Sequence, residues 1–419
     1  MISAKDKEIL RTLAKEVAEI ASLPQQQETI RKWKLLNDMK QVRPMVYIFE
    51  IPWWEINRVD EEMFLKTEDE RVRKMEEKLR MTLYLWKHVP MDMVVEPYYT
   101  VPKCIVHNLF DFGLEVERDL IPFDGGVGVP SSHYIPQIKD EADIEKIKTP
   151  RIWCDYKEAE KEYEWASEIL DGIMPVKKQG HTAFGFAPWD LLVMFCGPEQ
   201  LLLDLAMRPD YIHKLIDRLV TAYCDMLDQM EKLNLFSLGG GYHTVGGGLS
   251  FTDQLPQPDF NTDSIRLCDL WARAMAQIFS EVSPAMHEEF AIQYEKRYLN
   301  RAGLVYYGCC EPLHNKVEIV AKHIPKLRKI SMSPWVNIKK GYEATEGRFV
   351  FSFKPNPAFL ATKDKWDRES AKKQIQELLD ITKGKNVEII LKDISTVCHQ
   401  PHRLWEWAEM VMDMVKEYE

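Results

Sequence analysis

The stretch that decides the fold reads LVYYGCCEPLHNK at residues 304–316, LRKISMSPW at 327–335 and VFSFKPNP at 350–357. Each segment opens with a short apolar run of β type, and helical patterns fill the intervals. Strands that are buried on both faces and alternate with helices are typical of a parallel sheet with right-handed crossovers. The first run is followed by two thiols, a carboxylate and an imidazole. In barrels of alternating strands and helices, catalytic groups gather at such strand-to-helix junctions.

The same alternation extends outward along the chain. About eight or nine strand–helix units favour a barrel over an open doubly wound sheet, because no glycine-rich phosphate-binding fingerprint follows the first strand. We therefore predict an α/β protein with a (β/α)8 TIM barrel. The expected strands are Val46–Ile51, Met93–Tyr98, Val176–Gly180, Leu235–Leu238, Trp271–Phe279, Leu304–Tyr307, Leu327–Ser331, Phe349–Phe353 and Val387–Leu391. The expected helices include Glu68–Lys87, Asp155–Leu170, Pro209–Lys232, Lys363–Thr382 and His402–Glu417.

The first 43 residues have a different pattern. Apolar residues at helical spacing from Leu10 to Ile20 predict an amphipathic helix, and a second helix follows at about residues 28–39. We expect residues 1–43 to form an N-terminal helical arm and residues 44–419 to form one barrel domain. Glycine-rich loops at 124–132 and 239–248 are expected where barrel loops close over a ligand.

Composition narrows the class of partner. The chain has 419 residues, of which 45% are hydrophobic and 29% charged, and its net charge is −11. This acidic balance argues against nucleic acid or an anionic membrane surface as a partner. No apolar run reaches the roughly 18 residues of a membrane span, and the eight cysteines lack the spacing of a disulfide framework. We expect a cytoplasmic protein that acts on a small molecule or another protein.

Cys309 and Cys310 are the first candidates for chemistry. Adjacent residues on an extended strand point to opposite faces, but a turn near Tyr307–Gly308 would present Cys309 or Cys310 together with Glu311 to a metal. Thiolate, imidazole and carboxylate groups are ligands of Zn²⁺. The alternative is a buried pair of small apolar side chains.

Further candidates lie at other predicted strand ends and loops. His181 ends a predicted strand, and His243 lies between runs of glycine, where core packing is rarely the reason for a histidine. Asp393 follows the last strand and is either a general acid or base or a helix cap. Aromatic residues at or just past strand ends are candidate walls for a ring-shaped ligand; they include Trp53, Trp54, Phe186, Tyr306 and Trp335.

Two further motifs carry a family resemblance. SPAMHEEF at residues 283–290 and KPNP at 354–357, together with the strand before Cys309, resemble the uroporphyrinogen decarboxylase superfamily. The resemblance covers residues 44–417. It implies a (β/α)8 barrel, and the superfamily contains both decarboxylases and corrinoid-dependent methyltransferases. Fold-level analogy does not choose between these activities.

The segments near the expected site distinguish the branches of this superfamily. After the first strand the chain reads FEIPWWE at residues 49–55, whereas true decarboxylases have an arginine-rich run that binds the acidic porphyrinogen. Decarboxylation is therefore unlikely. The coenzyme M methyltransferase branch has His-x-Cys on the sixth strand, and Tyr307-Gly308-Cys309 keeps only the thiol.

The chain looks most similar to the substrate:corrinoid methyltransferases of acetogen-type O-demethylases. Glu145, Glu160 and His181 match a zinc spacing proposed for that branch. The resemblance implies a zinc site formed by these three residues and a corrinoid carried by a partner protein. The chemistry of the strand end adds Cys309 and Cys310 to the candidate zinc ligands.

The expected activity is transfer of a methyl group from a phenyl methyl ether to the Co(I) of the corrinoid protein, the ether-cleaving step of an anaerobic O-demethylase. Glu311, His243 and Asp393 are the expected catalytic residues. A zinc-dependent methylcobamide:thiol methyltransferase and a non-catalytic corrinoid-binding protein remain as alternatives. A homodimer is also left open.

Overall fold

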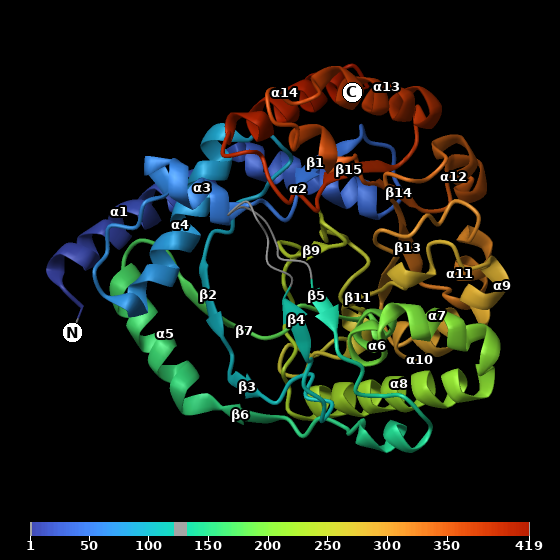
Figure 1. Ribbon diagram of the computed structural model, residues 1–419. Coiled ribbons are helices and arrows are strands. Elements are labelled where there is room, and N and C mark those ends of the chain that lie inside the picture. The colour runs from blue at the N-terminus through green and yellow to red at the C-terminus, as the bar shows by residue number, and fades with distance from the viewer. Residues whose placement is uncertain (1, 121–131, 419) are drawn as a thin grey trace.

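The computed structural model describes residues 2–120 and 132–418, so the predicted loop at 124–132 lies almost entirely outside the described residues. In this part of the chain a ring of helices surrounds a set of strands (Figure 1). None of the described helices is both long and apolar enough to cross a bilayer. The helices are α1 (Ala4–Ala21), α2 (Pro24–Asn37), α3 (Trp53–Val59), α4 (Glu70–His88), α5 (Tyr156–Leu170), α6 (Pro188–Cys196), α7 (Pro198–Met207), α8 (Pro209–Lys232), α9 (Pro284–His287), α10 (Gln293–Leu299), α11 (Val317–His323), α12 (Ile338–Thr345), α13 (Arg368–Thr382) and α14 (His402–Lys416). The strands are β1 (Met45–Ile48), β2 (Tyr99–Pro102), β3 (Ile105–His107), β4 (Arg118–Leu120), β5 (Ser132–Tyr134), β6 (Trp153–Asp155), β7 (Val176–Gln179), β8 (Ala183–Phe186), β9 (Thr244–Val245), β10 (Gly248–Leu249), β11 (Trp271–Ala274), β12 (Leu304–Tyr307), β13 (Leu327–Met332), β14 (Val350–Phe353) and β15 (Val387–Leu391).

The main sheet has seven strands in the order β1-β15-β14-β13-β12-β11-β8, and every neighbouring pair is parallel. Its two end strands, β1 and β8, share no ladder within the described residues. The fold is therefore a mixed α/β structure with a parallel half-barrel, compatible with a TIM-barrel-like architecture. Closure into a complete eight-stranded barrel is not seen in the described chain.

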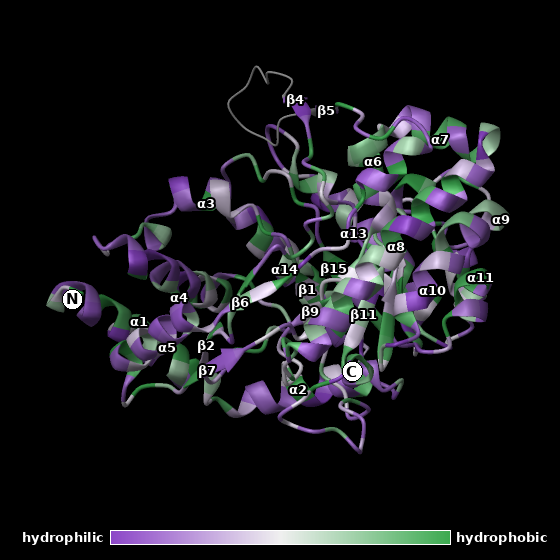
Figure 2. Ribbon diagram, turned by 90° about the horizontal axis from the view of Figure 1, so that it is seen from below, coloured by the Kyte–Doolittle hydropathy of each residue, from purple (hydrophilic) through white to green (hydrophobic). Residues whose placement is uncertain are grey.

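Side chains alternate between the two faces of this sheet, as the pleat requires. On the outer face apolar residues such as Val305, Ile330 and Phe351 join the large core that the helices cover. Figure 2 shows that helices such as α8 and α10 carry both hydrophobic and hydrophilic residues, as expected for an amphipathic outer layer. The inner face is mixed, with buried apolar residues such as Trp271, Leu304 and Ile390 beside many polar ones. Its polar residues include Arg273, Tyr306, Lys329, Ser331, Ser352, Lys354, Glu388 and Lys392.

The predicted N-terminal arm packs on two different parts of the molecule. Helix α1 lies against α4 and α5, beside the separate parallel pair β2–β7, at one end of the molecule (Figures 1 and 2). Helix α2 lies under the starts of the main strands. There Trp33 Nε1 donates to Asp92 O at 2.7 Å, and Asn37 donates to the carbonyls of Leu249 and Phe251. The buried ring of Trp33 joins Met45 in an apolar cluster at this edge of the sheet.

The glycine-rich hairpin β9–β10 lies against the inner face of the sheet. A Cβ atom at Gly246 would lie 2.1 Å from the ring of Tyr306, and one at Gly248 would lie 2.2 Å from the carboxylate of Glu388. Only glycine allows so close an approach, which explains the run of glycines in this segment.

Several predicted elements shift or disappear. Strands Leu304–Tyr307 and Val387–Leu391 occur as predicted. The expected strand Leu235–Leu238 is wrong as a strand of the sheet, since it forms only an isolated bridge between Phe236 and His181. Strand β8 was not predicted, because Gly185 interrupts its apolar pattern. The pairs β3–β6 and β4–β5 belong to an insertion that the strand–helix alternation did not indicate.

Candidate active site

The end of β12 places Cys309 at the mouth of the half-barrel. Gly308 continues the ladder by donating its N–H to Ala274 O at 2.8 Å, and its φ of +98° then turns the chain away from the strand direction. A Cβ at this glycine would lie 2.4 Å from Leu313 Cδ1. The predicted turn near Tyr307–Gly308 is present, and it brings the two sulfur atoms within 3.6 Å of each other.

Glu311 holds this turn from behind. Its side chain is fully buried, and its two carboxylate oxygens accept the backbone N–H groups of Cys309 at 2.9 Å and Ala276 at 3.1 Å. Burial raises the pKa of the carboxyl group, although these N–H donors oppose the shift. The geometry therefore gives Glu311 a positioning role for the loop, whereas the sequence predicted a catalytic one.

The two thiols contact a lysine and an aspartate that follow β15. Lys392 Nζ lies 3.0 Å from Cys309 Sγ, and the two sulfur atoms are 3.6 Å apart. Cys310 Sγ lies 3.5 Å from Asp393 Oδ2, which is 3.2 Å from Lys392 Nζ. Glu50, just beyond β1, accepts the backbone N–H of Asp393 at 3.2 Å. Three strand ends thus converge on one cluster at the mouth.

These contacts favour the thiolate form of Cys309. The hydrogen bond from Cys310 and the charge of Lys392 lower the pKa of Cys309 to about 7, against the opposing effect of burial. The shared proton raises the pKa of Cys310. Burial lowers the pKa of Lys392, but the neighbouring Cys309 outweighs it and the net shift is upward. Near neutral pH the cluster therefore pairs a thiolate with an ammonium.

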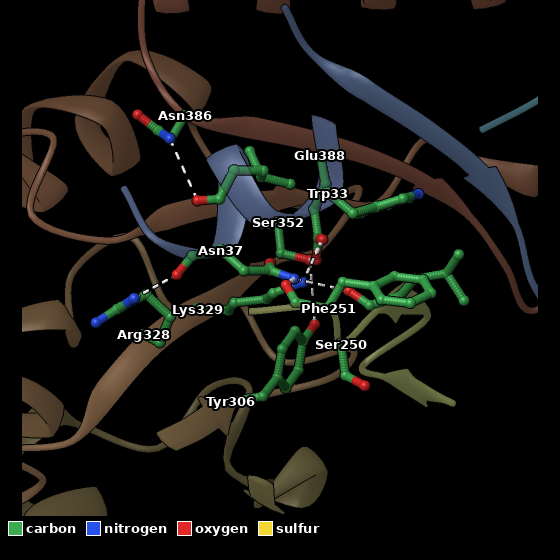
Figure 3. A network of polar contacts seen from close by, with 12 residues as sticks. Trp33, Asn37, Ser250, Phe251, Tyr306, Arg328, Lys329, Ser352, Asn386 and Glu388 are labelled. Atoms are coloured by element: carbon green, nitrogen blue, oxygen red, sulfur yellow. Dashed lines mark hydrogen bonds and ion pairs between the residues drawn. The ribbon is translucent and has the colours of Figure 1, made fainter. Parts of the chain in front are cut away.

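A buried polar network forms the floor beneath this cluster (Figure 3). Lys329 Nζ and Glu388 Oε2 are 2.7 Å apart, and both side chains are fully buried. Ser352 Oγ donates to the other oxygen of Glu388 at 2.5 Å and lies 3.4 Å from the hydroxyl of Tyr306. Lys354 Nζ donates to Ser352 Oγ at 2.5 Å, and burial lowers the pKa of Lys354 to about 8.

The lysines of this site were missed at the sequence level. Lys329, Lys354 and Lys392 each interrupt or directly follow an apolar strand run. A charged residue inside a strand that is otherwise buried is the signal that would have found them, because a buried charge requires a partner or a function.

A cavity of about 470 Å³ is lined by residues of β8 and by Phe49, and by none of the thiol cluster. Phe49, which follows β1 and precedes Glu50, forms part of one side, and β8 with helix α8 forms the other. This volume lies within the range of about 300–1,000 Å³ that is common for small-molecule sites. We call it the seam cavity. Its lining residues are Phe49, Leu109, Phe110, Gly180, His181, Thr182, Ala183, Phe184, Gly185, Tyr223, Met226, Leu227, Met230, His243, Thr244, Val245 and Arg273.

The two candidate histidines, His181 and His243, line the seam cavity, whose lining includes neither Cys309 nor Cys310. Burial lowers the pKa of His181, and it lowers that of His243 to about 4. His243 Nε2 lies 3.0 Å from Ser250 Oγ. Both imidazoles are therefore neutral at pH 7, which suits them for hydrogen bonding rather than for carrying charge.

The five predicted zinc ligands do not converge. Glu145 is exposed on a surface turn, and Glu160 forms an ion pair with Lys178 on the outside of the molecule. Within residues 2–120 and 132–418, no three His, Cys, Asp or Glu side chains are grouped as a metal site would require. Beside Cys309, Lys392 already occupies the position of a positively charged partner. The residues present therefore do not fit the predicted zinc set, because glutamates 145 and 160 lie elsewhere.

The predicted aromatic walls are dispersed. Trp53 and Trp54 begin α3, where they pack against Tyr84 and His399. Phe186 points to the outer core and stacks on Tyr223 with ring centroids 4.4 Å apart. Tyr306 is buried in the floor network, whereas Trp335 is 70% exposed just past the end of β13. None of these five lines the seam cavity, whose aromatic residues are Phe49, Phe110, Phe184 and Tyr223.

Comparisons with known proteins give a likeness of fold. No family model matches the chain, and no curated protein matches it in sequence. Among solved structures, a methyltransferase from Methanosarcina mazei is similar, with a TM-score of 0.52 and 12% sequence identity. The match covers 93% of this chain and 98% of that one. At this identity the likeness shows a shared fold alone.

Proposed function

We propose that the protein is a methyltransferase that moves a methyl group from a phenyl methyl ether to the cobalt of a separate corrinoid protein. The observation that carries the proposal is the contact between Lys392 and Cys309 at the mouth of a half-barrel that also holds a cavity of about 470 Å³. The fold that the chain shares with a methyltransferase supports the reaction class.

The chemistry requires help at the ether oxygen. The bond between the methyl carbon and oxygen breaks, the methyl carbon bonds to the acceptor, and the electron pair stays on the phenol oxygen. A phenolate is a poor leaving group, so a cation at that oxygen lowers the barrier. Lys392 supplies this cation, while Asp393 keeps the ammonium in place at 3.2 Å. The phenolate takes its proton from water after product release.

No step of the proposal uses a metal, because glutamates 145 and 160 lie away from the thiols and no described group of three ligands forms. Zinc bound by the predicted residues stays a prediction, which metal analysis of the purified protein tests. A corrinoid exceeds the drug-sized ligands that such cavities hold. We therefore place the corrinoid on its own protein, which would approach the mouth.

The second candidate is a methyl transfer in the opposite direction, from a methylated corrinoid to a thiol acceptor. The lowered pKa of Cys309 favours it, because the same pocket that stabilises this thiolate would stabilise a substrate thiolate. In that reaction the cluster activates the acceptor, whereas in ether cleavage it assists the leaving group.

The deciding experiment is anaerobic. Purified protein is mixed with chemically reduced cob(I)alamin, or with its corrinoid protein, and a panel of methoxylated aromatics, while the visible spectrum is recorded. Formation of methylated corrinoid with release of one phenol per methyl group supports the proposal. Lys392→Met should slow this reaction by at least about 100-fold, whereas Lys416→Met, on the exposed last helix turn, should leave it unchanged.

Two other outcomes reject the ether reaction. Loss of the methyl group from methylcobalamin only when a thiol is present establishes the second candidate. Stable binding of the corrinoid protein without either reaction establishes the non-catalytic alternative.

A further inference from the structure

The seam cavity has an unusual distribution of charge. Among its lining residues there is no aspartate, glutamate or lysine, and Arg273 is the single charged side chain. The two histidines are neutral at pH 7, because burial lowers the pKa of His243 to about 4 and also lowers that of His181. The lining therefore has a net charge of +1 at neutral pH.

The position of Arg273 on the sheet leaves its guanidinium free to bind a ligand. It lies on the inner face of β11, opposite Tyr306 on one side and Gly185 on the other. A Cβ at Gly185 would lie 2.4 Å from Arg273 Cγ, so the glycine provides the space in which the arginine stem lies. The side chain is exposed and makes no hydrogen bond or ion pair with any described residue. Its donors are thus free for a ligand.

The rest of the lining favours a flat, apolar ligand body. Four aromatic rings contribute, from Phe49, Phe110, Phe184 and Tyr223, and the side chains of Met226 and Met230 add flexible apolar surface from α8. An arginine guanidinium binds a carboxylate through two parallel hydrogen bonds, which a single point charge does not.

We propose that the seam cavity binds a small aromatic carboxylate, with Arg273 holding the carboxylate and the ring lying among the aromatic side chains. This binding site does not depend on the proposed function.

Binding is measured directly, without any turnover. Isothermal titration calorimetry compares 4-methoxybenzoate with 4-methoxybenzyl alcohol, a neutral analogue of similar shape, on the full-length protein. The acid should bind at least tenfold more tightly, as expected for charge-assisted hydrogen bonds. Arg273→Met should remove this advantage while leaving the weak binding of the alcohol unchanged. Arg273→Lys should restore part of it.

A matched control and a second variant separate binding from folding. Arg297→Met removes a cation that pairs with Asp217 on the outer helices, and it should not change the binding of the acid. Gly185→Ala should displace the arginine and weaken binding without removing any charge. Each variant is checked by circular dichroism and thermal unfolding.

Two results would contradict the proposed binding site. One is equal affinity of the acid and the alcohol for the unaltered protein, and the other is an affinity for the acid that Arg273→Met does not change. Failure of the two proposals can be told apart. Binding of the acid through Arg273 without methyl transfer keeps the site and rejects the ether-cleaving function. Turnover of methoxylated aromatics, together with binding of the acid that Arg273→Met leaves unchanged, keeps the function and rejects the site.

Discussion

At the scale of single residues, Cys309 is defined by what surrounds its sulfur. A second thiol lies 3.6 Å away and an ammonium 3.0 Å away, while Glu311 fixes the backbone N–H of the same residue. Each contact favours a negative sulfur or fixes its position. The reactivity of Cys309 should therefore depend on pH near neutrality rather than near the pKa of about 8.5 of an ordinary cysteine.

We predict that alkylation of Cys309 by iodoacetamide rises with pH around a midpoint near 7, because only the thiolate reacts and the pKa of this thiol is lowered to about 7. Lys392→Met and Cys310→Ala should each move the midpoint upward by about one unit or more, since each removes a cause of that shift. The rate is followed at residue level by mass spectrometry between pH 5.5 and 9.5.

Lys416→Met serves as the control for charge and should leave the alkylation profile unchanged. A midpoint near 8.5 in the unaltered protein would contradict the arrangement of the cluster. So would a midpoint that neither Lys392→Met nor Cys310→Ala moves.

Part of this site was predictable from the sequence, and the reason is topological. Cys309, Cys310 and Asp393 were candidates because each follows an apolar strand, and the structure brings them together because the ends of parallel strands meet at one edge. Arg273 was not predicted because an alternating polar residue in a short strand resembles an ordinary exposed side chain. Its importance depends on the other residues of the cavity, which come from segments far apart in the chain.

At the scale of elements, the hairpin β9–β10 determines what the inner face of the sheet can hold. Gly246 has a φ of +66°, and a Cβ there would enter the ring of Tyr306 at 2.1 Å. Gly384 has a similar φ of +75° but open space around it. Comparing alanine substitutions at Gly246 and Gly384 therefore separates the cost of backbone strain from the cost of steric conflict.

We predict that Gly246→Ala lowers the free energy of unfolding by about 2–5 kcal/mol, combining backbone strain with overpacking. Gly384→Ala should cost only the strain, about 1–2 kcal/mol. Urea unfolding of both variants measures the difference. Equal losses would show that the hairpin does not pack against Tyr306.

Elements were predictable where one physical signal dominated. The strands Leu304–Tyr307 and Val387–Leu391 are buried on every residue, and the long helix Pro209–Lys232 has a continuous apolar stripe, so each occurs with the predicted bounds. Segment 235–238 has the composition of a strand, but only Phe236 pairs, with His181. Pairing partners are a tertiary property, which local composition does not specify.

At the scale of the whole molecule, the mouth of the half-barrel is the surface where a partner protein would have to approach. Trp335 lies just past the end of β13 and is 70% exposed, which is unusual for so large an apolar side chain. Exposed tryptophans are common anchors of protein interfaces.

We predict that Trp335→Ala raises the KM for the corrinoid protein at least tenfold while leaving the rate with free cob(I)alamin unchanged, because only the protein partner needs the anchor. Trp153→Ala is the matched control, since Trp153 is 51% exposed on β6 and stacks on His107 away from the main sheet. Steady-state kinetics with both acceptors provides the measurement. Equal effects of the two substitutions would remove Trp335 from the docking surface.

The difference in burial between two inner-face cations has a consequence for how this protein tolerates change. Lys354 is buried and donates to Ser352, so its replacement would leave buried polar partners unsatisfied. Arg273 is exposed and has no such partner among the described residues. Substitutions at Arg273 can therefore change which ligands the inner face accepts at little loss of foldability, whereas substitutions at Lys354 carry a cost in folding.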